Sequence, residues 1–232
     1  MQAEKKQDIR KLTLEELEVY FLSVGEKKFR AKQVYEWLWN KSLKNFDEMS
    51  NISKSTREIL KEKFTINHIL VDQFQRSTDG TIKNAVKLYD NNIVESVLIP
   101  TSKRITACVS SQVGCSLDCN FCATARLKRM RNLNPDEIYD QVVAIQEEAS
   151  LYFDRPLTNI VFMGMGEPLL NYQNVLSAID KICSPEGLGI SPKRITLSTV
   201  GIGKMIRKLA DDEVKFNLAL SLHSAINETR TR

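Results

Sequence analysis

The sequence predicts an α/β protein whose main part is a parallel sheet or barrel. Helical periodicity dominates residues 1–66, strand-like alternation dominates residues 67–100, and strands alternate with helices over residues 101–232. Repeated strand–helix units with nearly continuous apolar strands favour a parallel sheet, because helices then cover it. We therefore expect a helical accessory domain, a short antiparallel β segment and a larger α/β core.

The composition is that of a folded, mildly basic protein. The chain has 232 residues, 42% of them hydrophobic, and a net charge of +4 at pH 7. These values allow a buried core and are compatible with an RNA partner without identifying one. Apolar runs are too short to span a membrane, and the polar start lacks the apolar core of a signal peptide. We expect a cytoplasmic protein.

Three helices are expected within the first 66 residues. Thr13 and Glu16 form a capping box before apolar residues that recur at helical spacing. Two further helices are expected near residues 29–41 and 53–64. Their lysines and arginines more often form a solvated surface, with RNA contact as the alternative.

The next region reads as antiparallel strands. Expected strands lie near residues 71–74, 85–89 and 93–99. Asp79-Gly80 is a signal for a two-residue hairpin between the first two of them. Glu95 alternates with apolar neighbours in the third strand, so the pattern alone makes it a solvent-facing residue.

The remaining elements alternate along the chain. We expect strands at residues 105–109, 159–163, 194–199 and 215–222, and helices at residues 135–152, 172–182 and 204–209. Sites in such folds lie at the carboxyl ends of the strands. Four polar or glycine-rich segments should then converge on one rim: residues 115–122, 164–168, 198–203 and 221–223.

The first of these segments carries a cysteine motif. Cys115, Cys119 and Cys122 follow the spacing C-x3-C-x2-C. A four-iron four-sulfur cluster normally takes four thiolates, so three would leave one iron open. Zinc usually takes four ligands, and neither a second cysteine pair nor a nearby histidine completes a set, since the only histidines are His68 and His223. A disulfide framework suits small secreted chains. The motif resembles the signature of the radical S-adenosylmethionine (SAM) enzymes.

The other segments are candidates for binding SAM beside such a cluster. Glycines at residues 164–168 let the backbone approach a ligand, and Glu167 adds a carboxylate. Ser198 and the segment 221–223 add hydroxyls and an imidazole. Each feature alone would suit a tight turn or a structural residue. The basic run at residues 126–131 is either solvated surface or a phosphate contact.

Longer stretches resemble one family in particular, the RlmN-type radical SAM RNA methyltransferases. Three stretches carry this resemblance. The first runs from VSSQVGC (Val109–Cys115) to ATA (Ala123–Ala125), the second is GMGEPLLN (Gly164–Asn171), and the third is LALSLH (Leu218–His223). The resemblance covers nearly the whole chain. It implies a partial (βα) barrel, a 4Fe-4S cluster and SAM as cofactors. It also implies methylation of carbon 2 of adenosine in large-subunit ribosomal RNA and in transfer RNA near the anticodon.

The resemblance also assigns site residues. It implies that Cys115, Cys119 and Cys122 ligate the cluster, and that SAM is contacted by Gly166, Glu167, Ser198, Ser221, Leu222 and His223. Glu95 matches a proton-acceptor carboxylate, and Cys108 matches a cysteine that resolves a methyl-linked intermediate. A disulfide bond, an external flavodoxin-like reductant and a monomeric state are implied as well.

In this family the methyl-carrying cysteine lies well beyond His223, past the last residue, Arg232. We therefore expect a C-terminally truncated chain that is inactive alone. Two alternatives stay open. One is the sister activity that methylates carbon 8 of adenosine and confers antibiotic resistance. The other is a non-catalytic iron–sulfur fragment that binds RNA.

Overall fold

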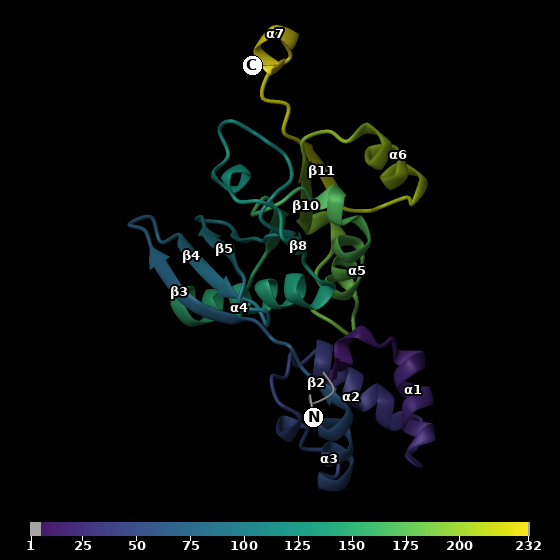
Figure 1. The fold of residues 1–232 in the computed structure, drawn as a ribbon. Helices are drawn as coiled ribbons and strands as arrows, with labels where there is room; N and C mark the ends of the chain where they lie inside the picture. Colours follow the sequence, from purple (N-terminus) through teal and green to yellow (C-terminus); the bar gives the residue numbers. More distant parts are fainter. Residues whose placement is uncertain (1–5, 232) are drawn as a thin grey trace. The chain divides into compact units, whose positions relative to one another are not determined.

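The structure is a computed structural model that describes residues 6–231 and divides into two units (Figure 1). One unit contains the residues up to His68 together with Lys181–Gly189. The other contains Ile69–Asp180 and the residues from Ile190 onward. Within the described residues, no helix combines the length and apolar character needed to cross a membrane.

The first unit is mainly helical. It contains β1 (Gln7–Asp8), η1 (Ile9–Lys11), α1 (Leu14–Ser23), α2 (Phe29–Trp39), η2 (Phe46–Glu48), α3 (Lys54–Lys63) and β2 (Phe64–Thr65). The predicted capping box is confirmed. Thr13 Oγ1 accepts from the Glu16 amide at 3.2 Å, and Glu16 Oε2 accepts from the Thr13 amide at 2.8 Å. The box satisfies two amides at the start of α1, which packs against α2.

A distant segment completes this unit. Lys181 Nζ lies 4.5 Å from the centroid of the Tyr35 ring and 5.2 Å from that of Trp39, which is cation–π geometry. Burial lowers the pKa of Lys181. Asn40 Nδ2 donates to the Gly187 carbonyl at 3.2 Å, across 147 positions of sequence. No local sequence pattern reveals a contact of this range.

The second unit is built on one sheet with the strand order β11-β10-β9-β6-β5-β4-β3. The strands are β3 (Leu70–Arg76), β4 (Ile82–Lys87), β5 (Ile93–Pro100), β6 (Ile105–Cys108), β9 (Asn159–Phe162), β10 (Ile195–Thr199) and β11 (Asn217–Leu220). β3 to β6 pair in antiparallel fashion, whereas β6, β9, β10 and β11 are parallel. The predicted α/β class is confirmed.

The turn between β3 and β4 differs from the two-residue hairpin that Asp79-Gly80 suggested. The strands end at Arg76 and resume at Ile82, which leaves a five-residue loop (residues 77–81). Asp79 Oδ1 accepts from the Thr81 amide at 2.9 Å, and its Oδ2 accepts from the Thr81 hydroxyl at 3.1 Å. The Ser77 amide also donates to the Thr81 carbonyl at 2.9 Å, so backbone and side-chain bonds together close this loop.

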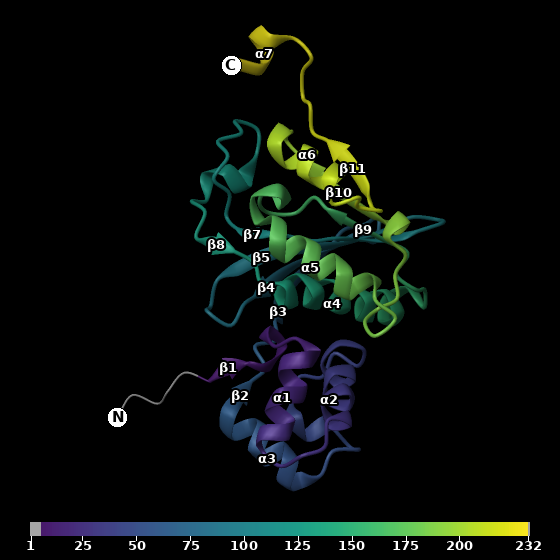
Figure 2. The same ribbon diagram turned by 90° about the vertical axis from the view of Figure 1, so that its right-hand side faces the viewer.

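The other elements of this unit are helices and short strands, and α4 and α5 lie along one side of the sheet (Figure 2). They are β7 (Gln112–Val113), η3 (Ala123–Arg126), β8 (Arg131–Asn132), α4 (Pro135–Phe153), η4 (Pro168–Asn171), α5 (Tyr172–Cys183), η5 (Pro192–Arg194), α6 (Gly203–Asp211) and α7 (Asn227–Thr231). α4 packs against β5 and β6. It begins with Pro135 after a capping box of Asn134 and Glu137, and it ends where Asp154 turns left-handed with φ 49°.

The two faces of the sheet differ in exposure. Because side chains alternate along a strand, Val94, Leu98 and Ala107 share one face, where they are fully buried. Glu95, Cys108 and Ser198 lie on the other face, as the strand register places them. That second face is the more open one. It carries the polar side chains that the sequence analysis singled out.

Glu148 of α4 predicts a pH dependence of folding. Its carboxylate accepts from buried Asn84 Nδ2 at 2.9 Å, and burial raises its pKa above the ordinary value. The folded state therefore holds this proton more tightly than the unfolded state, and stability should fall as pH rises through the folded pKa. Glu148→Gln should flatten this fall in urea unfolding between pH 4 and pH 7. Exposed Glu36→Gln should keep the wild-type slope; equal slopes for all three proteins would contradict the prediction.

Candidate functional site

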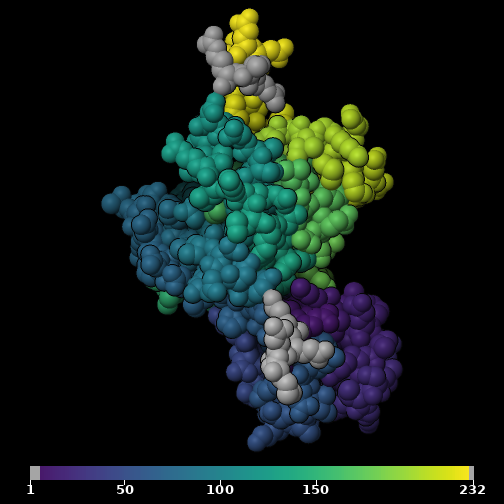
Figure 3. Space-filling view, in the orientation of Figure 1, coloured from purple at the N-terminus to yellow at the C-terminus, as the bar shows by residue number. Residues whose placement is uncertain are grey.

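The three cysteines of the motif lie in a loop that is closed at its base by a short β pair. Gln112 pairs with Asn132 and Val113 with Arg131, so β7 and β8 bring the two ends together. The Cys115 amide donates to the Leu127 carbonyl at 3.3 Å. Gly114 has φ +71°, and a Cβ there would collide with the Lys128 carbonyl. Glycine at this position therefore permits the two strands of the loop to approach. Figure 3 shows the region (teal) at the surface of its unit.

Arg131 anchors the end of this cysteine loop. Its guanidinium donates to Glu137 through Nη1 and Nη2, each at 2.7 Å, and to Asp90 through Nε at 2.6 Å. The Arg131 contact holds the pKa of Asp90 at about 2, so this carboxylate is ionised at neutral pH. Glu137 also accepts from the Asn134 amide at 2.8 Å. The loop is thereby tied to the start of α4 and to the turn after β4.

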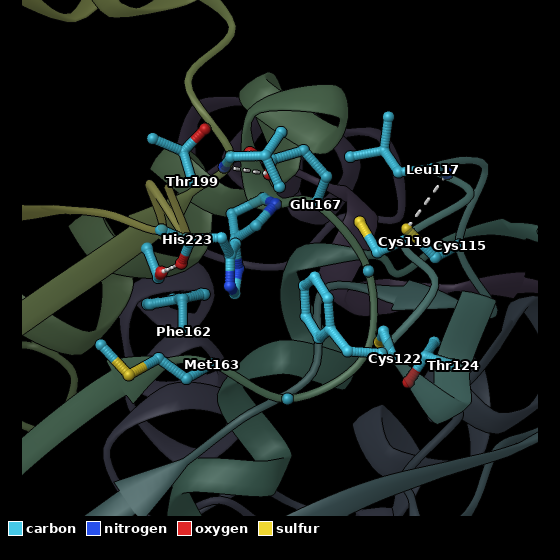
Figure 4. Close-up of a pocket in the computed structure, with 17 residues that line it drawn as sticks. Cys115, Leu117, Cys119, Cys122, Thr124, Phe162, Met163, Glu167, Thr199 and His223 are labelled. Carbon is cyan, nitrogen blue, oxygen red and sulfur yellow. Dashed lines mark hydrogen bonds between the residues drawn. The ribbon is translucent and has the colours of Figure 1, made fainter. Parts of the chain in front are cut away.

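Four segments line one pocket of about 290 Å³ (Figure 4). They are the cysteine loop, the turn after β9, the end of β10 and the residues after β11. Among the predicted site residues, the pocket is lined by Cys115, Cys119, Cys122, Gly166, Glu167, Ser198, Ser221 and His223. Leu222, Glu95 and Cys108 are not part of its lining. The four segments that were expected to converge therefore line one pocket at the ends of the strands.

Glu167 is held by backbone amides. Its side chain is buried, with Oε2 accepting from the Val200 amide at 3.0 Å and Oε1 from the Leu169 amide at 3.1 Å. Both carboxylate oxygens therefore have partners from the chain itself. The carboxylate joins the turn after β9 to the end of β10, which gives it a structural role in addition to its place in the pocket wall.

The far side of the pocket is formed by residues around β11. The hydroxyls of Ser198 and Ser221 lie 2.9 Å apart and share a hydrogen bond. His223 has φ +59°, and its ring faces that of Phe121, with centroids 4.1 Å apart and an interplanar angle of 37°. The cysteine loop therefore touches the segment after β11. His223 closes the pocket opposite the cysteines in Figure 4.

The thiols influence one another electrostatically. Desolvation raises the pKa of Cys119, and the neighbouring Cys122 and Cys115 raise it further. Within residues 6–231, no group of three or more His, Cys, Asp or Glu side chains is placed to hold a single metal ion. A cluster differs, because its thiolates bind separate irons. Three thiols in one pocket, with the ionisation of Cys119 disfavoured by its two neighbours, fit a cationic iron–sulfur group that would relieve this repulsion.

Cys108 lies beside the pocket. It is 8% exposed, and desolvation raises its pKa to about 11 despite a hydrogen bond from the backbone of Met163. Met163 itself lines the pocket. A thiol with this pKa is protonated at neutral pH.

Glu95 is solvent-facing, as its strand pattern predicted. Its side chain is about half exposed and pairs with Lys83 Nζ at 3.0 Å. Because Val97 pairs with Cys108 in the register of β5 and β6, Glu95 stands two residues away on the same sheet face. Glu95 and Cys108 therefore lie on neighbouring strands and on the same open sheet face, next to the pocket.

Sequence reasoning missed a buried polar layer beneath the pocket. Ser110 Oγ accepts from the Met165 amide at 2.8 Å and donates to the Glu95 carbonyl at 2.5 Å. The Gln141 side chain pairs with both the amide and the carbonyl of Ser110, at 2.9 and 3.2 Å. The sequence did carry one signal of this layer. Ser110 and Gln141 are polar, although they stand where the end of a buried strand and the apolar face of a helix would normally have apolar residues.

Gln112 belongs to the same layer and joins two loops. Its Oε1 accepts from the Glu167 amide at 2.9 Å, and its Nε2 donates to Asn132 Oδ1 at 2.8 Å. A Cβ on Gly166, which has φ +93°, would lie 2.5 Å from Gln112 Cβ. The glycine therefore serves the packing of the turn against Gln112, whereas the sequence suggested only close approach of a ligand.

The expected disulfide bond is contradicted. Within the described residues, Cys108, Cys115, Cys119, Cys122 and Cys183 form no disulfide bond. Cys108 is separated from the cysteine loop by its position in β6, on the sheet itself.

Family models match both units. The N-terminal domain of ribosomal RNA large subunit methyltransferases matches residues 7–66, and the radical SAM superfamily matches residues 109–231. A crystal structure of a radical SAM methyltransferase from Sphaerobacter thermophilus superimposes with a TM-score of 0.87 at 35% identity. That match covers 97% of this chain and 66% of the other.

Curated relatives are more similar still. The chain is 71% identical to a probable dual-specificity RNA methyltransferase RlmN of Christiangramia forsetii, over 99% of this chain and 65% of that protein. It is 68% identical to the protein of the same name from Flavobacterium psychrophilum, over 100% of this chain and 67% of that protein. The chain thus spans about two thirds of their length. It belongs to the radical SAM superfamily and, within it, to the RlmN family.

Proposed function

We propose that this protein is a radical SAM methyltransferase that modifies carbon 2 of adenosine in large-subunit ribosomal RNA and in transfer RNA near the anticodon. The observation that carries the proposal is the pocket shared by the three cysteines, the Gly164–Pro168 turn and the ends of β10 and β11. The relatives named as dual-specificity RNA methyltransferases support the choice of substrate.

Cys115, Cys119 and Cys122 would hold a 4Fe-4S cluster with one iron left open. When bound, this group supplies an iron that coordinates SAM and a path for the electron that SAM cleavage requires. The chain's own part is to hold the thiols in one pocket and to keep them near the SAM-binding segments. The β7–β8 pair and Arg131 support that role by fixing the base of the loop.

The opposite wall of the pocket would bind SAM. The hydroxyls of Ser198 and Ser221 can hydrogen-bond to ribose, and the ring of His223 offers a flat surface for adenine. Gly166 and the backbone held by Glu167 would meet the methionyl group, with Leu222 as a neighbour. Ligand contacts made by backbone and hydroxyl groups at strand ends are common in folds of this class.

Carbon 2 of adenine carries a hydrogen that is not acidic, so a polar methyl transfer would fail there and a radical route is needed. Cys108 would resolve the methyl-linked intermediate, and Glu95 would accept the ring proton. Both lie on the open sheet face next to the pocket, which supports their roles. The target base has to leave its stack to reach them.

The remaining partners follow from this chemistry. The first unit would contact RNA, since its family model is that of an rRNA methyltransferase domain. An external one-electron donor of the flavodoxin type would supply reducing equivalents. The protein would act as a monomer in the cytoplasm, where its RNA substrates are found.

Removal of one cluster ligand tests the cofactor assignment. Cys119→Ala, reconstituted anaerobically with iron and sulfide, should lose the cluster absorbance and electron paramagnetic resonance signal and form no 5′-deoxyadenosine from SAM with dithionite. Cys183→Ala, a change to a cysteine that does not line the pocket, should retain both. Normal SAM cleavage by Cys119→Ala would contradict the assignment of Cys119 as a cluster ligand.

Gln112→Leu tests the coupling of the two loops. The change leaves the buried Glu167 amide without a partner, at a cost of about 1–3 kcal/mol. SAM should bind about tenfold more weakly while the cluster content is unchanged, as measured by equilibrium dialysis and iron analysis. Exposed Gln75→Leu is the control. Wild-type SAM affinity in Gln112→Leu would show that the bridge is not needed.

The reaction itself is tested with protein purified from its native source. Nucleoside analysis by mass spectrometry of rRNA and tRNA should show 2-methyladenosine, and Glu95→Gln should lower its rate by about 10²-fold or more, as expected for loss of a general base. Exposed Glu62→Gln should be neutral. Formation of 8-methyladenosine would identify the sister activity. RNA binding without any SAM cleavage would favour a non-catalytic iron–sulfur protein.

A further inference from the structure

The cysteine loop has a second hollow besides the pocket. Its volume is about 330 Å³, and it is lined by Cys115, Ser116, Leu117, Asp118, Ala125, Lys128 and Arg129. Only Cys115 and Leu117 also line the pocket. Cys115 thus forms part of the wall of the pocket and of the second hollow. The second hollow therefore gives access to this cysteine from a side that does not include the proposed SAM-binding segments.

The rim of this hollow combines positive charge with exposed apolar side chains. Arg126, Lys128 and Arg129 are exposed and lie within four residues of one another. Between and beside them, Leu127 is 54% exposed and Met130 is 68% exposed. Asp118 is the one acidic residue in the lining. We call Arg126–Met130 together with the hollow the basic loop surface.

We propose that the basic loop surface is the docking site of an acidic one-electron carrier protein that reduces the enzyme. The proposal rests on the proposed function, which requires one electron for each SAM that is cleaved. The carrier is oxidised by one electron, and SAM accepts that electron as its sulfonium–carbon bond breaks, which gives methionine and a 5′-deoxyadenosyl radical. The carrier has to approach while SAM and the RNA base occupy the pocket, and the second hollow leaves that approach open.

The chemistry of the surface favours a protein over RNA. Phosphate contacts use cations and hydrogen-bond donors and gain nothing from exposed Leu127 and Met130. Methionine and arginine are enriched at protein interfaces. Weak redox encounters bury small areas, which a patch of this size can supply, and opposite charge raises their association rate.

The surface is also held in shape before any partner arrives. The Met130 amide donates to the Val113 carbonyl at 2.9 Å, and the Leu127 amide donates to the Thr124 carbonyl at 3.0 Å. Arg131 follows directly and is fixed by Glu137 and Asp90. A pre-ordered patch loses less conformational entropy on binding than a flexible loop would.

The test compares two charge reversals in the cluster-loaded protein. Arg126→Glu/Lys128→Glu changes the surface and leaves Arg129, which also donates to Asn132, in place. Lys103→Glu/Arg104→Glu makes the same charge change in the exposed turn after β5. Cluster reduction by a fully reduced flavodoxin is followed by stopped-flow absorbance at several salt concentrations, and binding of oxidised flavodoxin is measured by flavin fluorescence.

We expect Arg126→Glu/Lys128→Glu to lower the second-order reduction rate by about tenfold at low salt, with a smaller salt dependence. Binding of oxidised flavodoxin should weaken in parallel, and the turn variant should resemble wild type. Leu127→Ser/Met130→Ser should weaken binding without changing the salt dependence. Equal rates and binding for the surface and turn variants would overturn the proposal.

Two further measurements distinguish the docking proposal from the proposed function and from RNA binding at the same surface. SAM cleavage driven by dithionite should be the same in all variants; its absence in wild type would reject the proposed function, while the flavodoxin-binding comparison would still decide the docking site. Binding of a transfer RNA is measured on the same proteins. Loss of RNA binding with intact flavodoxin binding in Arg126→Glu/Lys128→Glu would identify the surface as an RNA contact and overturn the proposal.

Discussion

The side-chain amide of Gln112 is the contact on which the arrangement of the site depends. It is fully buried and bonds at one end to the Glu167 amide and at the other to Asn132. The first bond holds the turn after β9, and the second holds the strand that closes the cysteine loop. Because a buried amide that loses a partner is costly, both loops keep one relative position.

The surrounding polar layer extends this constraint to the sheet. Ser110 links the turn after β9 to the backbone of β5, and Gln141 links Ser110 to α4. Asn171 Nδ2 donates to the carbonyls of Ser111 and Leu133, each at 2.8 Å. Strand ends that would otherwise carry unpaired backbone groups are therefore satisfied by side chains. A site assembled from several loops gains the rigidity of the sheet in this way.

Above this layer, the two sides of the cysteine loop face different surroundings. One side meets the pocket, where hydroxyls and the His223 ring stand opposite the thiols. The other side carries cations and exposed apolar residues. Arg131 holds the loop between the two sides, because its guanidinium is paired with the carboxylates of Glu137 and Asp90. These charged groups therefore have a structural role. The proposed SAM site lies on the first side, and the proposed docking surface for the electron carrier lies on the second.

The sequence by itself determined the α/β class, the order of strands and helices, and the segments that meet in the pocket. These follow from periodicity, capping residues and cysteine spacing, which are local properties of the chain. Only the tertiary structure decided that residues 181–189 join the helical unit, that five residues separate β3 from β4, and that Glu167 is bound by two amides. It also decided that Gln112 and Ser110 form the base of the site. Their partners lie tens of residues away, and a hydrogen bond between distant segments leaves no period or spacing in the sequence.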